Sequence, residues 1–219
     1  QHQSLLAQRW EDWRRVAGPE QVAVVEAQCE EREKATALAR VLVGSDFFVQ
    51  QCTRRPELLA QLLTQSDCGL PAPDVQALES EEQLERELRR LRNRVNAEVI
   101  WRDFAGQWDI PTACARLTGL AEVCIQTALD WHRQKMAERH GEPRNREGDI
   151  QPMVVLGMGK LGARELNLSS DIDLIFAYPE AGQSDGGCSE GKPLENQAFF
   201  QRLGQRLIKS LDTVTADGF

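Results

Sequence analysis

Apolar residues recur every three or four positions through most of the chain, which is the spacing of one face of an α-helix. Three stripes comprise Leu6, Trp10, Trp13 and Ala17; Leu84, Leu88, Leu91, Val95 and Val99; and Leu117, Leu120, Ala121, Cys124, Ala128 and Trp131. The third stripe predicts a helix that begins after Pro111 and ends near Gly141, because proline suits a first helical turn and glycine commonly follows a last one. We therefore expect an amino-terminal helical bundle over residues 1–147.

A segment rich in glycine, proline and charge, residues 141–151, separates this bundle from a region with a different pattern. Two short β-favouring runs follow, Met153–Leu156 and Leu174–Ala177, bounded as buried strands usually are. After a turn-rich stretch, residues 179–193, one more helix is expected to turn five apolar residues inward: Phe200, Leu203, Leu207, Ile208 and Leu211. Because two strands rarely form a stable sheet alone, we expect residues 148–219 to be a second domain that is truncated at its carboxyl end.

Composition and charge narrow the class of protein. The chain has 219 residues, of which 41% are hydrophobic and 27% charged, as in soluble folded proteins. Its net charge of -8 provides no positive field for nucleic acid, and no apolar run approaches the roughly 18 residues that a membrane span requires. Six cysteines without a CxxC pair, and only three histidines, argue against zinc. We expect reduced cysteines and a cytoplasmic protein with neither nucleic acid nor membrane as a partner.

The first β-favouring run leads into a glycine loop, residues 157–162, that matches the dinucleotide-binding pattern GxGxxG. That fold needs a crossover helix and an acidic residue about 20 positions further on, whereas Asp171 comes nine residues after Gly162. Only about two helical turns fit between the two runs, which favours an antiparallel pair with the loop close to the aspartates. We interpret the loop as a phosphate site that uses the N–H groups of Gly157 and Gly159; a purely structural turn is the competing interpretation.

Asp171 and Asp173 alternate with Ile172 and Leu174 at the start of the second run. Alternate side chains of a strand share a face, so both carboxylates are predicted to point the same way, with Cα atoms about 7 Å apart. Magnesium prefers hard oxygen ligands and commonly binds through one or two carboxylates plus substrate phosphates. Asp171 and Asp173 are therefore our candidate catalytic residues and ligands of Mg²⁺, with Mn²⁺ as the alternative ion. An aspartate pair that merely caps a strand is the competing interpretation.

Three polar side chains near this pair are candidate phosphate ligands. The Ser170 hydroxyl can donate to a phosphate oxygen, Ser169 lies beside it, and Lys160 can neutralise phosphate charge, although such lysines are more often simply solvated. The candidates for nucleotide or phosphate binding are thus Gly157, Gly159, Lys160, Ser169 and Ser170. The tryptophans are expected to anchor helix packing. Most of one group of arginines is expected to form a solvated helix face: Arg86, Arg89, Arg90, Arg92, Arg94 and Arg102.

Residues 157–176, GMGKLGARELNLSSDIDLIF, closely resemble the glutamine synthetase adenylyltransferase family, whose two-headed members attach AMP to, and remove it from, a tyrosine of glutamine synthetase. The resemblance extends to Ser45-Asp46-Phe47, to RRLRNRVNAEVIWRDF at 89–104 and to QRLGQRLIKSLDTVTADGF at 201–219. It implies an α+β fold in which a helical bundle precedes an incomplete nucleotidyltransferase domain of the DNA polymerase beta type, a mixed sheet flanked by helices. The sequence of residues 167–173, preceded by a long helical region, is more similar to the amino-terminal, adenylyl-removing copy of that domain.

The resemblance implies a reaction in which inorganic phosphate attacks the α-phosphorus of adenylyl-tyrosine and releases ADP, as part of a bifunctional enzyme that regulates nitrogen assimilation. Asp171 and Asp173 would hold metal ions that align nucleophile and leaving oxygen. The implied partners are glutamine synthetase, ATP or ADP, phosphate and the PII signal protein. Two departures matter: Ala163 stands where the family usually has glycine, and the family's third acidic residue is expected beyond Phe219. We therefore expect weak metal binding and leave the activity of this chain alone open.

Three other functions remain open. The first is the forward reaction, transfer of AMP from ATP to the same tyrosine, since the metal chemistry is the same in both directions. The second is a non-catalytic interaction module with vestigial aspartates. The third is a nucleotidyltransferase acting on a small molecule, such as an antibiotic-modifying enzyme, against which the long helical region argues.

Overall fold

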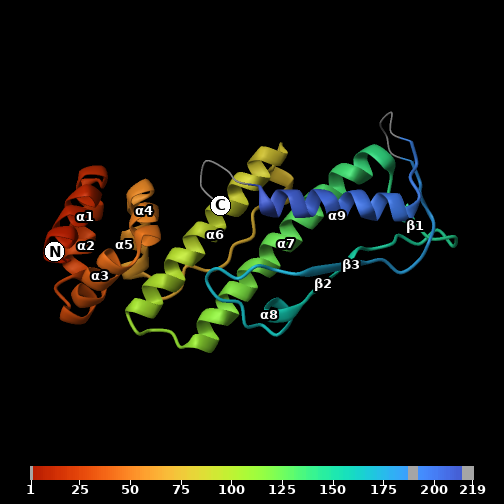
Figure 1. The fold of residues 1–219 in the computed structure, drawn as a ribbon. Helices are drawn as coiled ribbons and strands as arrows, with labels where there is room; N and C mark the ends of the chain where they lie inside the picture. The colour runs from red at the N-terminus through yellow and green to blue at the C-terminus, as the bar shows by residue number, and fades with distance from the viewer. Residues whose placement is uncertain (1, 187–191, 214–219) are drawn as a thin grey trace. The chain divides into compact units, whose positions relative to one another are not determined.

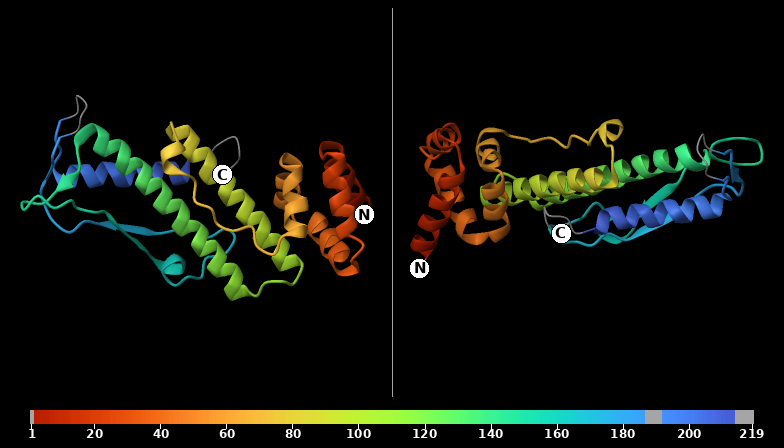
Figure 2. Two further views of the ribbon diagram at one scale, coloured as in Figure 1. Left: turned by 180° about the vertical axis from the view of Figure 1, so that it is seen from behind. Right: turned by 90° about the horizontal axis from the view of Figure 1, so that it is seen from above.

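The computed structural model describes residues 2–186 and 192–213, which are helical for the most part and contain two small antiparallel sheets (Figure 1). The predicted α+β class is thereby confirmed. The chain divides into two compact units: unit 1 comprises residues 1–70 and 91–117, and unit 2 comprises residues 71–90 and 118–219. The two longest helices, α6 (Glu81–Phe104) and α7 (Ile110–His140), are continuous and contribute to both units (Figure 2). The domain assignment of 1–147 and 148–219 stays a prediction.

Unit 1 contains five further helices, which are coloured red to orange in Figure 1: α1 (His2–Val16), α2 (Pro19–Gln28), α3 (Arg32–Gly44), α4 (Asp46–Arg54) and α5 (Pro56–Thr64). Local signals set their starts: Pro19 and Pro56 open α2 and α5, and the Ser45 side chain accepts from the N–H of Phe48 at 3.2 Å to cap α4. The core packs Trp13 and Phe48 with Trp101 of α6. The predicted first stripe is confirmed, since its other members pack against this core while partly buried.

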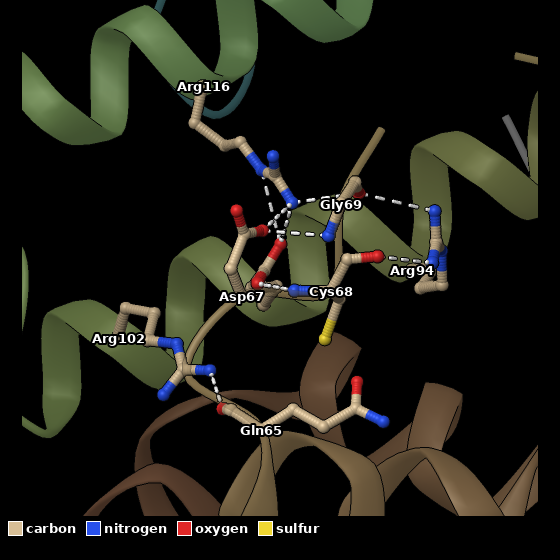
Figure 3. A network of polar contacts seen from close by, with 8 residues as sticks. Gln65, Asp67, Cys68, Gly69, Arg94, Arg102 and Arg116 are labelled. Carbon is tan, nitrogen blue, oxygen red and sulfur yellow. Dashed lines mark hydrogen bonds and ion pairs between the residues drawn. The ribbon is translucent and has the colours of Figure 1, made fainter. Parts of the chain in front are cut away.

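A buried ion pair in unit 1 holds the segment that follows α5 (Figure 3). The Glu98 carboxylate has no solvent exposure; its Oε2 accepts from Nη2 and Nε of Arg116 at 2.6 and 3.2 Å, and its Oε1 accepts from the N–H of Cys68 at 2.9 Å. Arg116 also donates to the carbonyl oxygen of Gly69 at 2.8 Å. Burial, with the Glu98 charge adding to it, raises the pKa of the Cys68 thiol to about 11. The network fixes the backbone around this thiol, which is protonated at neutral pH.

Unit 2 contains the short strands and three further helical elements: η1 (Val75–Ala77), β1 (Pro143–Arg144), β2 (Val154–Gly157), α8 (Gly159–Gly162), β3 (Leu174–Ala177), β4 (Gln183–Ser184) and α9 (Asn196–Asp212). Strand β1 pairs with β4, and β2 pairs with β3, both antiparallel. The β2–β3 register runs from Val154 opposite Ala177 to Gly157 opposite Leu174. The prediction of an antiparallel pair joined by a short helical segment is confirmed.

The prediction that β2 and β3 are buried strands is wrong for one of their two faces. Helix α9 covers the inner face so closely that a Cβ atom on Gly204 would lie 3.1 Å from Phe176 and 3.3 Å from Met153. Val154 and Ile175, which point the other way, are exposed. In the described residues, helices cover the hairpin from one side only, so its side chains alternate between partly buried and exposed.

Helices α7 and α9 each bury a stripe of apolar side chains in the described part of unit 2. The long helix predicted between Pro111 and Gly141 is confirmed as α7. Of the residues predicted to turn inward on α9, Phe200, Leu203 and Leu207 are buried, but Ile208 is 52% exposed and that prediction is wrong. The fully buried Phe199 completes the stripe instead, because a step of one residue from Leu207 turns a side chain about 100° around the helix.

A polar pair lies within the α7–α9 contact. His132 Nε2 lies 2.7 Å from Ser210 Oγ, and both side chains are almost completely buried. Burial lowers the pKa of His132 to about 4, an effect to which Arg206 and Lys209 add and which Glu81 opposes. His132 is therefore neutral at physiological pH.

The prediction of a solvated arginine face on α6 holds for Arg86 and Arg90, which are exposed, but it is wrong for Arg89 and Arg102, which are 7% and 4% exposed. Within unit 2, Arg89 donates to two carbonyl oxygens at the end of α9, those of Leu211 and Thr213, each at 2.6 Å. Within unit 1, Arg102 donates to the carbonyl oxygen of residue 65 just after α5. The last carbonyls of a helix lack partners inside the helix, and a guanidinium group supplies several donors to them.

Two other expectations concern the chain as a whole. The structure describes five cysteines and places none of them in a disulfide, whereas Cys188 lies outside the described residues. None of the helices in residues 2–186 and 192–213 is both long enough and apolar enough to cross a membrane. The turn-rich stretch 179–193 is described only in part, from 179 to 186 and from 192 onward.

Candidate active site

The glycine loop bends the chain from β2 directly into the short helix α8. A Cβ atom on Gly157 would lie 2.7 Å from the Leu161 side chain, and one on Gly162 would lie 2.5 Å from the Gly157 carbonyl oxygen. Both glycines therefore permit a close approach of backbone and side chain. Gly159 differs, because its φ of +54° is in the left-handed region and a Cβ atom there would come within 4.0 Å of Asp173 Oδ2. Close packing explains why Gly157 and Gly162 are glycines. Gly159 is the glycine that lies beside the Asp173 carboxylate.

Asp171 and Asp173 are both exposed, while Ile172 and Leu174 between and after them are partly buried, as the alternation predicts. Strand β3 begins at Leu174, so the two aspartates immediately precede it. The N–H of Met158 donates to the Asp173 carbonyl oxygen at 2.9 Å, which extends the pairing beyond β2 and β3. Within the described part of the chain, neither carboxylate forms an ion pair or a side-chain hydrogen bond. Two carboxylates without protein partners fit the hard-oxygen preference of Mg²⁺ when substrate phosphates complete the coordination.

A hydrogen-bonded turn precedes Asp171. The Ser170 hydroxyl donates to Asn167 Oδ1 at 2.5 Å and accepts from the Asn167 N–H at 3.2 Å. The N–H groups of Ser169 and Ser170 donate to the Asn167 carbonyl oxygen at 3.0 and 3.2 Å. Asn167 was not among the predicted site residues, although asparagine three positions before serine is a common turn-forming combination. It is this turn that presents Asp171 to solvent.

The remaining candidates lie around the same loop. Lys160 is exposed on α8 and makes no ion pair in the described residues, and Ser169 is exposed next to Ser170. Ala163, where the resemblance would have glycine, has an ordinary helical backbone with φ -79° and ψ -6°, so the alanine is unstrained. The following residue, Arg164, has a φ of 61° and pairs with Glu122 at 2.8 Å. No group of three or more candidate metal-binding side chains occurs among the residues that the structure describes.

A cleft of about 380 Å³ lies between α7 and the inner face of the hairpin. Its lining is mixed: Ile125, Leu129, Val155 and Leu174 are apolar, whereas Gln126 and the Glu122–Arg164 ion pair are polar. Leu174 points to the opposite side of the chain from Asp173, because successive residues of an extended chain alternate. The two aspartate carboxylates therefore do not point into this cleft.

These features define an α+β protein in which a small antiparallel sheet, covered by helices on one face, presents two aspartates beside a glycine loop, neither of them paired within residues 2–186 and 192–213. Comparison with known proteins agrees with the earlier resemblance: a family model described as glutamate-ammonia ligase adenylyltransferase matches residues 35–219. The chain belongs to this family.

Three relatives, each named a bifunctional glutamine synthetase adenylyltransferase/adenylyl-removing enzyme, illustrate the similarity. The protein of Thioalkalivibrio sulfidiphilus is 47% identical over 193 residues, covering 84% of this chain and 20% of that protein. The protein of Xanthomonas campestris pv. campestris (strain B100) is 46% identical, covering 83% of this chain and 19% of that protein. The protein of Pseudomonas aeruginosa is 41% identical, covering 93% of this chain and 22% of that protein. The chain thus spans about a fifth of the length of the curated relatives that it matches.

Proposed function

We propose that this chain contributes the metal-binding face of an adenylyl-removing site that acts on adenylylated glutamine synthetase. The observation that carries the proposal is that Asp171 and Asp173 are exposed and have no side-chain partner among the described residues, with Asp173 directly beside Gly159. Support for the substrate comes from the relatives, whose names contain both glutamine synthetase and the adenylyl-removing activity. The PII signal protein is proposed as a regulatory partner on the family resemblance alone.

The proposed reaction is phosphorolysis. An oxygen of inorganic phosphate attacks the α-phosphorus of adenylyl-tyrosine, the bond from that phosphorus to the tyrosine oxygen breaks, and ADP and protonated tyrosine are released. When bound, Mg²⁺, or Mn²⁺ in its place, would neutralise charge on the transferring phosphoryl group. Asp171 and Asp173 would hold the ion, so the chain supplies charge and positioning and no covalent nucleophile.

The residues around the aspartates would hold the phosphate oxygens. The N–H of Gly159 is accessible to an anion because no Cβ shields it. Ser169 would donate its hydroxyl proton and Lys160 would balance phosphate charge; both side chains are exposed in the structure. Ser170 and Gly157 remain proposed ligands, although each also has a local role, in the turn with Asn167 and in the contact with Leu161.

Forward transfer of AMP from ATP is the second candidate, because the relatives' names contain both activities. Incubation of the natural protein that carries this sequence with adenylylated glutamine synthetase, phosphate and Mg²⁺ should release ADP. The matched reaction with unmodified glutamine synthetase and ATP tests the forward direction. Incorporation of AMP in the second reaction, without ADP release in the first, would replace our proposal with the forward one.

A magnesium titration tests the non-catalytic alternative. Calorimetry of the 219-residue chain with MgCl₂ in the presence of ADP should show saturable binding, and the Asp171→Asn and Asp173→Asn variants should weaken it. Equal signals from the parent chain and both variants would show that the aspartates are vestigial.

A further inference from the structure

The outer face of the β2–β3 hairpin is lined by exposed apolar side chains and ends at a carboxylate. Val154 is 41%, Leu156 49%, Met158 45% and Ile175 48% exposed, and we call these four residues the apolar strip. Leu156 and Ile175 are directly opposite each other in the register. Met158 directly follows β2, and its N–H donates to the carbonyl oxygen of Asp173. Side chains of alternate residues share a face, so the strip and the Asp173 carboxylate lie on the same surface.

Single exposed apolar residues are normal on protein surfaces, but a contiguous group on one face indicates a binding surface. The opposite face of the same hairpin is covered by α9 through Phe176 and Met153, so the core that the described residues form does not bury the strip. The described residues thus leave an apolar surface exposed immediately beside the proposed metal site.

We propose that the apolar strip holds the adenine ring of the nucleotide whose phosphates are bound at Asp171 and Asp173. The inference rests on the proposed function and adds the nucleotide-base subsite to it. A nucleotide has a flat, weakly polar base at one end and charged phosphates at the other, joined by the ribose. The hairpin presents the same order along one strand: Ile175 follows Asp173 by two residues, a Cα separation of about 7 Å.

The size of the strip favours a small ligand over a protein. A specific protein interface buries about 800 Å² on each partner, which is more than four half-exposed side chains can provide. Small-ligand sites, in contrast, combine an apolar lining with a few polar groups that fix orientation. The aspartates, through a divalent cation, would supply the charge complementary to phosphate. We therefore identify the occupant as an adenine nucleotide rather than a second copy of the chain.

The test compares two ligands that differ in whether they carry a base. Calorimetry of the 219-residue chain with Mg²⁺ measures the affinity for ADP and for inorganic pyrophosphate. The variants Leu156→Thr and Ile175→Thr keep a strand-compatible side chain and remove most of the apolar surface. We expect each to weaken ADP binding about tenfold and to leave pyrophosphate binding unchanged. The matched control is Ile208→Thr, which removes an equally exposed isoleucine from α9 and should change neither affinity.

The outcomes separate this inference from the proposed function. Unchanged ADP affinity in both strip variants, or an equal loss of ADP and pyrophosphate affinity, would overturn the base subsite while leaving the metal site in place. Loss of ADP affinity in the strip variants together with no effect of Asp173→Asn would keep the subsite and refute the metal-binding role. If sedimentation shows that the strip variants abolish self-association at unchanged ADP affinity, the strip is an interface between copies and the inference is wrong.

Discussion

The Ser170 hydroxyl donates a 2.5 Å hydrogen bond to Asn167 Oδ1, and the Asn167 N–H donates to the same hydroxyl oxygen at 3.2 Å. The Ser170 hydroxyl thereby donates its proton to a hydrogen bond within the turn that precedes Asp171. The neighbouring Ser169 hydroxyl is exposed, so in this arrangement Ser169 is the serine whose proton remains available to a phosphate. The turn itself becomes part of the site, because it determines where the first aspartate points.

A double-mutant cycle tests the coupling between these two residues. Asn167→Ala removes the acceptor and Ser170→Ala the donor of the same side-chain hydrogen bond, so the double variant should lose less stability than the sum of the single variants. We expect a coupling free energy of about 1 kcal/mol from urea unfolding. Additivity within about 0.3 kcal/mol would show that the contact contributes nothing to the turn.

Replacing either aspartate should remove activity without unfolding the protein. Asp171→Asn and Asp173→Asn keep the side-chain size and remove the charge that a divalent cation needs, so turnover in the natural protein should fall by two or more orders of magnitude. The midpoint of thermal unfolding should stay constant or rise slightly, because two neighbouring like charges no longer repel each other. Full turnover in either variant would exclude that residue from the site.

The buried Glu98–Arg116 pair should be a large contributor to the stability of unit 1. Glu98→Gln leaves the Arg116 guanidinium, whose side chain is 12% exposed, without its main counter-charge, which should cost about 3 kcal/mol in urea unfolding. The control is Glu11→Gln, which breaks an exposed pair with Arg14 at 3.4 Å and should change stability by less than about 0.5 kcal/mol. Similar losses in both variants would contradict the role assigned to burial.

Acid should weaken the α7–α9 contact through His132. The folded-state pKa of about 4 lies below the ordinary value of 6.5, so the unfolded chain takes up the proton first as the pH falls. The stabilisation is fully present above pH 6.5 and is lost progressively toward pH 4, by about 3 kcal/mol in total. Urea unfolding of the parent chain and of His132→Gln at several pH values measures how much His132 contributes to the pH dependence of the unfolding free energy. Parallel pH profiles for the two proteins would show that His132 does not contribute.

The glycine loop offers a paired test of backbone packing. Gly162→Ala would bring a Cβ atom to 2.5 Å from the Gly157 carbonyl oxygen, so the loop must shift, and we expect a loss of about 1–3 kcal/mol in unfolding free energy. Ala163→Gly restores the glycine that the family usually has, at a helical backbone position, and should cost about 0.5–1 kcal/mol. A stabilising effect of Ala163→Gly would show that the alanine is strained.

Much of the local structure could be predicted from the sequence, because helices and strands are set by periodic patterns within short segments. The stripe from Leu117 to Trp131, with Pro111 and Gly141 as its boundaries, predicted α7 to within two residues at its start and one at its end. The alternation around Asp171 and Asp173 predicted their shared exposed face. The short distance from Gly162 to Asp171 predicted the antiparallel hairpin, since no crossover helix fits there.

The burial of particular faces could not be predicted in the same way. Ile208 belongs to the helical pattern of α9 but points to solvent, while Arg89 and Arg102, charged residues on an amphipathic helix, are buried against carbonyl oxygens of other segments. Asn167 was likewise not predicted as a site residue from the sequence. In each of these cases the outcome depends on which partner atoms lie nearby in space, and periodicity contains no information on that.

The sequence by itself determined the secondary structure, the hairpin and the pair of adjacent acidic residues, because steric preferences and hydrophobic periodicity act over a few neighbouring residues. Tertiary structure alone decided that α9 covers one face of the hairpin and leaves the apolar strip and both carboxylates exposed on the other. It also decided that the Ser170 proton is bound within its own turn. These features follow from the packing of α9 onto β2 and β3 and from the folded geometry of the loop, which no local pattern specifies.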